Sequence, residues 1–313
     1  MTASRESGGE HVVQPPLPPD HHHPRGRREK LELHSARVPF RLKLVVVWAV
    51  ILGILVALFA AASFDTAWMR ENAGFIARGI TWTIVIAVLA IALACVLALL
   101  GALGRLSRNA IAVGVTSFYT SFFRGTPLIV QLFLIYLALP QIGIALGDPW
   151  ADLLTLDVLT AGVIALGLNY GAYMTEIFRA GIQSVGHGQS EAAEALGMTY
   201  VQKMRRVMLP QGFRVIIPPT GNEFIAMMKD TALVSFLGTS IDQMEIFRRA
   251  QLLGRADFRN LEALLVAALM YWGLTTVFQY FQLRLERRLS KGYVRGTARV
   301  AVAGQREPAA RKR

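Results

Sequence analysis

Three ionisable side chains lie in and beside a short apolar segment late in the chain, and residues of these types could bind a polar ligand. Glu223 and Asp230 are seven positions apart and would share one face of a helix. Lys229 lies about 100° around the helix axis from Asp230, and its flexible stem could reach the same cavity. Ionisable groups inside a membrane are costly and usually face a cavity, the bundle interior or a partner. Acids beside a cation suit a zwitterionic ligand; the alternative is a charge-balanced cluster that only anchors this segment.

A second polar group lies in an earlier apolar segment. Asn169, Tyr173 and Glu176 are spaced at i, i+4 and i+7, so they form one stripe on a helix. We expect most of this stripe to serve helix packing, Tyr173 to contact a ligand, and Glu176 to pair with Arg179 as a gate or brace. Gln131 either lines the chamber or bonds a neighbouring helix. The candidate residues of a substrate path are Gln131, Tyr173, Glu223, Lys229, Asp230 and Thr231.

Catalysis is not indicated by the sequence. It contains no G-x4-G-K-[ST] nucleotide-binding loop and no HExxH pair, and His187 is the only histidine beyond residue 34. The single cysteine, Cys95, allows neither a disulfide nor a cysteine-based metal site. The triplet 21–23 of histidines beside Pro24 could bind a metal, but we expect an incidental linker feature. We therefore predict a conduit with no catalytic residue, no metal site and no cofactor of its own.

The composition indicates a membrane protein. Of 313 residues, 53% are apolar and only 17% are charged, whereas soluble domains average about 25% charged residues. The net charge is +12, but the basic residues flank apolar runs instead of alternating with aromatics, so we expect no nucleic-acid partner. Residues 1–43 and 285–313 are predicted to be basic cytoplasmic segments, the first of them disordered.

Six segments are predicted to cross the membrane, in an all-α fold: 44–62, 80–103, 127–145, 160–178, 224–237 and 261–283. The 19 residues of the first reach about 28 Å as a helix, and it begins too far into the chain for a cleaved signal peptide. The segment 224–237 is the least apolar of the six. We also predict that the helix is interrupted at Pro218-Pro219, just before the segment 224–237.

Loop charges fix the expected orientation. The head through Lys43 carries eight Lys and Arg, and the tail from Arg284 carries ten against two acids, so both ends should be cytoplasmic. The loops 105–124 and 203–214 are basic and should lie inside, whereas 148–157 is acidic and should lie outside. The loop 240–260 has four Arg against three acids and fits its outside location least well.

The sequence of the second cytoplasmic loop, within residues 183–214, predicts a helical hairpin. Residues 189–196 favour a helix, Gly197 allows a sharp bend, and Tyr200 to Met208 can form a second amphipathic helix that ends before Pro210. The simpler alternative is a helix that lies on the lipid headgroups. Seven residues of this loop form a spaced motif over twenty positions: Glu191, Ala192, Ala193, Gly197, Val207, Leu209 and Pro210.

This pattern resembles the EAA loop of ATP-binding-cassette importer permeases, which have Ile where Val207 stands. The resemblance implies that the seven residues couple the chain to a separate ATPase subunit, which binds ATP and Mg. Five short runs are similar to the polar amino-acid branch, the histidine/glutamine/arginine type: 124–128, 171–173, 176–177, 179–182 and 229–231. The sequence departs from that branch at Ala232, where Ser is more usual.

The resemblance covers about residues 76–284, with a coupling loop at 183–214, and leaves out the head and an additional N-terminal helix at 44–62. It implies a type I importer transmembrane domain in a bacterial cell membrane, paired with a second permease chain, identical or not, and supplied by an extracytoplasmic solute-binding protein. Alternatives are a permease for another small polar solute, such as an opine or a compatible solute, and a proton-coupled secondary transporter that uses Lys229 and Asp230. A secondary transporter has no use for an ATPase-docking hairpin.

Overall fold

The computed structural model describes residues 39–61 and 63–289, which fall into two units that divide between Phe64 and Asp65. The first unit holds α2 (Phe40–Ala61). Its residues are apolar all round, and the side chains described on it are exposed, which suits a helix surrounded by lipid. Most of the predicted head and tail, residues 1–38 and 290–313, lies outside the described residues.

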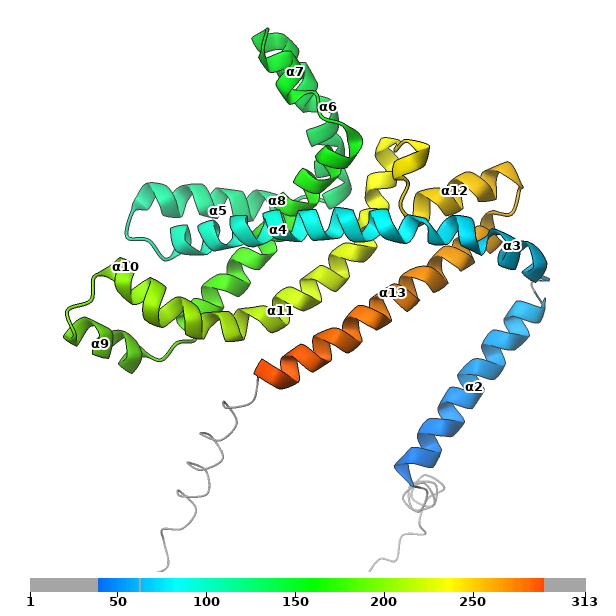
Figure 1. Cartoon of the computed structure of the whole chain (residues 1–313), viewed down its shortest axis with the longest axis horizontal. Helices are drawn as coiled ribbons and strands as arrows, with labels where there is room; N and C mark the ends of the chain where they lie inside the picture. The colour runs from blue at the N-terminus through cyan, green and yellow to red at the C-terminus, as the bar shows by residue number, and fades with distance from the viewer. Residues whose placement is uncertain (1–38, 62, 290–313) are drawn as a thin grey trace, which may run out of the picture. The chain divides into compact units, whose positions relative to one another are not determined.

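The second unit consists of helices joined by short loops, and no strand occurs among its described residues (Figure 1). Its helices are α3 (Thr66–Ala77), α4 (Gly79–Arg105), α5 (Ala110–Gly125), α6 (Leu128–Leu146), α7 (Trp150–Leu154), α8 (Val158–Gln183), α9 (His187–Ala195), α10 (Tyr200–Lys203), the π-helical turn η1 (Met204–Met208), α11 (Leu209–Asp230), the 3-10 helices η2 (Thr231–Leu237) and η3 (Ile241–Gln243), α12 (Ile246–Ala256) and α13 (Asn260–Leu289). Four described segments are long and apolar enough to cross a membrane: Thr66–Arg105, α6, α8 and α13. The predicted all-α membrane fold is confirmed.

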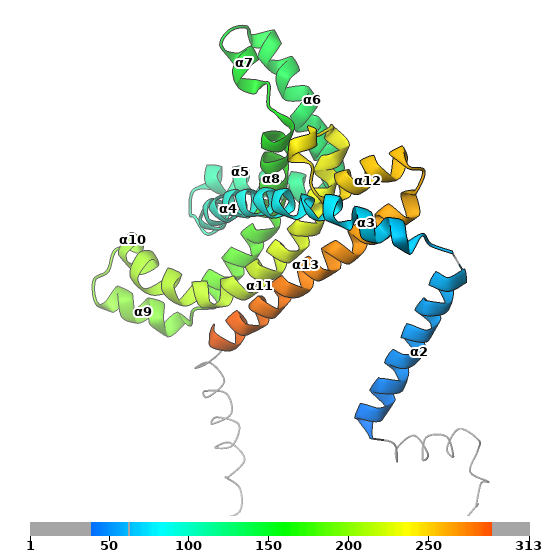
Figure 2. The same cartoon turned by 45° about the vertical axis from the view of Figure 1, so that its right-hand side comes forward.

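The core of this unit is built on the contact between α4 and α8, which cross near its middle with α11 alongside (Figures 1 and 2). Ala90, Ala94 and Ala98 recur every four residues on α4 and are fully buried. Opposite them, a Cβ on Gly167 of α8 would lie 2.6 Å from Leu93 Cδ2. Small residues on both helices therefore allow the backbones to approach closely, as is common in membrane bundles.

The segment after the hairpin differs from the sequence prediction. Instead of a span over 224–237, the chain is helical from Tyr200 to Asp230 through α10, η1 and α11, and only then changes to the 3-10 helix η2. The predicted helix end before Pro210 is wrong, because helix continues from η1 into α11 and Pro210 lies in the first turn of α11. The predicted interruption at Pro218-Pro219 is also wrong, since both prolines lie within α11.

The start of α12 is held by one buried carboxylate. Glu245 is fully buried and accepts hydrogen bonds from the backbone N–H groups of Phe247 (2.8 Å) and Arg248 (2.6 Å) at the start of α12. It also accepts bonds from the hydroxyls of Ser235 in η2 and Tyr271 in α13. A single side chain thus joins three elements of this loop region.

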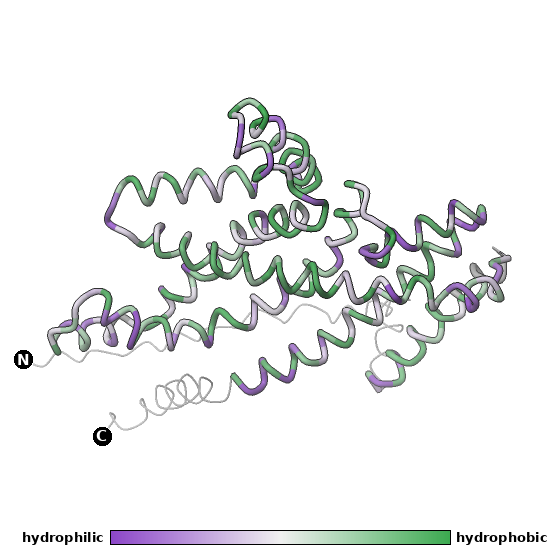
Figure 3. Tube along the Cα trace, turned by 45° about the horizontal axis from the view of Figure 1, so that its top comes forward, coloured by the Kyte–Doolittle hydropathy of each residue, from purple (hydrophilic) through white to green (hydrophobic). Residues whose placement is uncertain are grey.

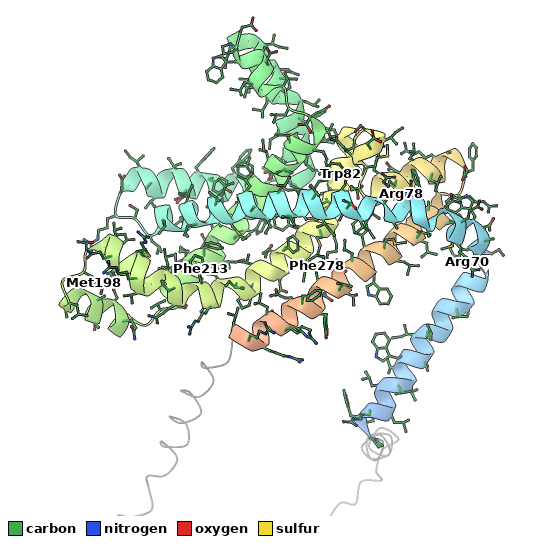
Figure 4. The ribbon with its side chains drawn as sticks, viewed as in Figure 1. Arg70, Arg78, Trp82, Met198, Phe213 and Phe278 are labelled. Atoms are coloured by element: carbon green, nitrogen blue, oxygen red, sulfur yellow. The ribbon has the colours of Figure 1, made fainter. Side chains whose placement is uncertain are left out.

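The distribution of polarity follows these elements. Apolar residues dominate the long helices, whereas hydrophilic residues gather at the C-terminal end of α13 and in the α9–α10 region (Figure 3). Phe278 of α13, labelled in Figure 4, packs against Phe224 of α11 with ring centroids 5.4 Å apart. The end of the unit that carries α9 and α10 is therefore the one suited to contact water and polar partners.

Candidate coupling hairpin and polar path

A tight turn joins α9 to α10, and Gly197 forms it in a left-handed conformation with φ +75°. The N–H of Gly197 bonds Glu194 O (2.9 Å) and that of Met198 bonds Ala193 O (3.1 Å), which satisfies carbonyl groups at the end of α9. Beyond the turn, Thr199 and Gln202 form a reciprocal capping box at the start of α10. The predicted hairpin with a glycine bend is confirmed.

The two arms of the hairpin are also joined by charge. Lys203 Nζ donates to Glu194 Oε1 (2.5 Å) and to Ser190 Oγ (3.0 Å), and its side chain is 14% exposed. The hydrogen bond and positive charge of Lys203, together with the charge of Arg108, hold the pKa of Glu194 below its usual value. The carboxylate therefore stays ionised near neutral pH. Sequence reasoning missed this pair, although opposite charges on either side of a glycine turn were a usable signal.

The tip of the hairpin is unusually apolar for a surface in water. Leu196, Tyr200 and Val201 are 77%, 54% and 70% exposed. Exposed apolar patches of this kind mark sites that contact a partner or a membrane. The seven motif residues divide between two environments: Glu191, Ala192, Gly197 and Pro210 are exposed, whereas Ala193 is buried and Val207 and Leu209 are half-buried.

The hairpin is connected to α11 without an interruption. The N–H of Leu209 bonds Met204 O, five residues back, which makes the π-helical turn η1. Helix continues on both sides of this turn, so the hairpin and α11 share one helical connection. Figure 4 labels Met198 in the hairpin and Phe213 on α11, at the two ends of this connection.

On α11, two of the predicted path residues lie close to a tyrosine that the sequence analysis did not select. Tyr170 of α8 donates its hydroxyl to Asp230 Oδ2 at 2.7 Å. Glu223 lies half-buried two turns earlier on α11, and Lys229 is exposed with no hydrogen bond or ion pair to any described residue. Thr231 is fully buried and donates to Met228 O (2.9 Å). Its hydroxyl is therefore used within the chain, and its assignment as a path residue stays a prediction.

Gln131 is buried at the junction of α5, α6 and α8, where it bonds its neighbours. It is 2% exposed, and its Nε2 donates to Phe123 O (2.8 Å) and Thr126 Oγ1 (2.7 Å). Its Oε1 accepts from Asn169 Nδ2 at 3.0 Å. Gln131 therefore joins the α5–α6 connection to α8, which is the bond to a neighbouring helix that the sequence offered as one alternative.

Tyr173 and Glu176 lie together on another face of α8. The Tyr173 side chain is 44% exposed, and the Arg124 guanidinium lies 5.4 Å from the centre of its ring. Glu176 pairs with Arg179 (2.8 Å), as predicted, and also with Arg105 at the end of α4 (3.4 Å). Arg105, Arg124, Tyr173 and Glu176 line a cavity of about 560 Å³. Tyr170 and Asp230 are not among its lining residues.

Comparisons with known proteins agree with this geometry. Residues 97–291 match the family described as "Binding-protein-dependent transport system inner membrane component". The chain is 38% identical to the probable amino-acid ABC transporter permease protein PatM of Vibrio harveyi, over 74% of this chain and 99% of that protein. It is 42% identical to the L-cystine transport system permease protein TcyB of Bacillus subtilis, over 68% of this chain and 86% of that protein. It is 37% identical to the arginine transport system permease protein ArtQ of Bacillus subtilis, over 69% of this chain and 92% of that protein.

Two solved structures have similar folds. One is an amino acid ABC transporter with histidines, with a TM-score of 0.63 and 36% identity over 72% of this chain and 99% of that chain. The other is the MetNI methionine ABC transporter in an inward-facing conformation, with a TM-score of 0.51 and 19% identity over 69% of this chain and 96% of that chain. The second likeness concerns the fold alone.

Proposed function

The chain belongs to the family of binding-protein-dependent transport system inner membrane components, and from this premise we propose that its α9–α10 hairpin receives an ATPase and drives the polar residues of α11. The chain is the type I permease subunit of an ATP-binding-cassette amino-acid importer, and ATP hydrolysis lies in a separate subunit. The family implies an ATPase partner, a binding-protein partner and a membrane setting. The alternative of a secondary transporter is thereby set aside.

The observation that carries the coupling proposal is the exposed apolar tip on a continuous helical connection. Leu196, Tyr200 and Val201 give the ATPase a surface to bury, and Glu191 and Ala192 flank it on α9. The ATP and Mg are bound by the ATPase. Its movement reaches α11 through η1 and shifts the side chains that contact the transported molecule.

The proposed path uses Glu223 and Asp230 for the ammonium group of an amino acid and Lys229 for its carboxylate. Lys229 has no partner among the described residues of this chain and is therefore available to a ligand. A second permease chain, identical or homologous, supplies the other side of this path. The extracytoplasmic binding protein delivers the amino acid. The names of the relatives, which include arginine and cystine permeases, support amino acids over opines or compatible solutes.

Asp230→Asn should reduce substrate-stimulated ATP hydrolysis by about tenfold, because a hydrogen-bonded charge contributes about 1.5–3 kcal/mol to the interactions it makes. Basal hydrolysis and assembly should persist, since the shape of the side chain is kept. Tyr170→Phe, which removes only the hydroxyl bonded to Asp230, should have a smaller effect. Hydrolysis and melting temperature are measured on one preparation of the permease–ATPase complex, with the binding protein and each candidate amino acid added. A destabilised complex with normal activity per folded molecule contradicts the ligand role.

The proposed orientation places both termini on the cytoplasmic side of the bacterial cell membrane. In a Cys95→Ser background, Asp20→Cys and Val300→Cys should be labelled by an impermeant thiol reagent from the same side. Asp152→Cys, in the acidic loop at α7, should be labelled from the opposite side and serves as the control. If the two termini label from opposite sides, the six-span arrangement fails, and the segment 44–62 is the span to reject.

A further inference from the structure

A cavity of about 820 Å³ lies between the hairpin and the end of α4. This volume falls in the range of about 300–1,000 Å³ that is typical of sites for small ligands. Its apolar wall comes from Leu103 and Leu106 at the end of α4, Met204 in η1 and Leu209 at the start of α11. The cavity thus lies between the coupling hairpin and the end of α4.

The rim of the cavity is positively charged. Arg108, Lys203 and Arg205 line it, and Glu194 is the single acid among its lining residues. Lys203 is already paired with Glu194. Arg108 and Arg205 form no hydrogen bond or ion pair with any residue that the structure describes. With three basic residues and one acid, the rim therefore keeps a net charge of +2 beside an apolar wall.

We propose that this cavity binds an anionic phospholipid of the cytoplasmic leaflet, with its phosphate at Arg108 and Arg205 and its acyl chains along the apolar wall. This inference rests on the orientation proposed above, which puts the cavity at the cytoplasmic membrane surface. Basic pockets between spans on that side are suited to anionic headgroups. A free phosphate would satisfy the charges but would leave the apolar wall in contact with water. Tyr200 and Val201 line the cavity and also belong to the exposed tip, so the bound lipid lies next to the surface that receives the ATPase.

The test uses the purified permease–ATPase complex and dioleoyl phosphatidylglycerol as the probe. The double variant Arg108→Gln/Arg205→Gln removes the two free charges of the rim. Its control, Arg206→Gln/Arg214→Gln, removes two charges from η1 and α11 at positions that do not line the cavity. Binding is measured by native mass spectrometry during titration with the lipid, and melting temperature is recorded for each variant.

The rim variant should bind phosphatidylglycerol roughly 25-fold more weakly than the wild type, at about fivefold for each charge near an anionic headgroup. The control should keep the affinity of the wild type, and phosphatidylcholine should bind weakly to all three proteins. Equal losses in rim and control variants would mean unspecific attraction and overturn the proposal. Unchanged binding by the rim variant, at an unchanged melting temperature, overturns it as well.

Two further arms separate the possible occupants. Inorganic phosphate should fail to displace the lipid; displacement at similar concentrations would make the cavity a site for free anions. Lipid that binds the permease alone but not the complex would make the ATPase the occupant. The lipid-binding measurement does not depend on transport. If the wild-type complex binds the lipid normally but takes up no amino acid, the result contradicts the proposed function and leaves the lipid proposal intact.

Discussion

Gly197→Leu should reduce amino-acid uptake at least roughly tenfold while the protein remains in the membrane. Gly197 has φ +75°, and an L-residue in the left-handed region costs about 1–2 kcal/mol. No atom lies within 4 Å of a Cβ built at this position, so the penalty comes from the backbone and not from a clash. The hairpin would change its bend and displace the apolar tip from the position that the ATPase requires. Uptake into proteoliposomes and copurification with the ATPase measure the effect.

The hairpin offers a matched control for this change. A Cβ at Gly188 on α9 also meets nothing within 4 Å, and its φ is not positive, so Gly188→Leu should retain most of the uptake. Gly197→Asn should fall between the two, since Asn tolerates the left-handed region better than Leu. Wild-type uptake by Gly197→Leu with normal ATPase association would remove the assignment of this loop to coupling.

Glu245→Ala should be the most destabilising substitution in the loop region that carries α12. It removes the N-terminal cap of α12, worth about 1 kcal/mol. It also leaves the buried hydroxyls of Ser235 and Tyr271 without their acceptor, at about 1–3 kcal/mol each. A loss of about 4 kcal/mol in the free energy of unfolding is therefore expected. Urea or thermal unfolding of the protein in detergent measures it.

The exposed carboxylate of Asp257, at the other end of α12, provides the comparison. It accepts a hydrogen bond from Trp68 Nε1 at 2.8 Å, but the bond is open to solvent, so Asp257→Ala should cost about 1 kcal/mol or less. Glu245→Gln keeps one acceptor oxygen and should fall between the two alanine variants. A stability of Glu245→Ala equal to that of Asp257→Ala would show that the buried network is not what holds α12.

The sequence predicted those parts of the fold that depend on local preferences. The hairpin was predicted because helix propensity and a glycine bend act within a few residues, and α9 and α10 begin at His187 and Tyr200, within two residues of the predicted starts. The course of α11 could not be predicted in this way. Its apolar run begins only at Phe224, and prolines at 218 and 219 usually end a helix, whereas packing against α8 and α13 keeps this one continuous.

The same distinction applies to the candidate site. Glu176 and Arg179 are one turn apart, so their pairing follows from helix geometry alone. The Tyr170–Asp230 bond joins α8 to α11 across sixty positions of the chain, and no local pattern specifies it. Gln131 and Thr231 show the limit of arguments from residue type, because the same side chain can face a cavity or brace a junction. Only their burial and their partners decide between the two.

The π-helical turn between the hairpin and α11 has a consequence for insertions and deletions. A π turn holds one residue more than an α turn spanning the same length, and each residue of a helix rotates the next one by about 100° around the axis. The loss of one codon within Met204–Met208 would let the segment become ordinary α-helix, with its hydrogen bonds intact. Because an α turn covers the same rotation with one residue fewer, the hairpin would keep its direction. The loss of one residue from the regular helix of α11 would instead rotate the hairpin by about 100°, so η1 is the place in this connection where a one-residue deletion is best tolerated.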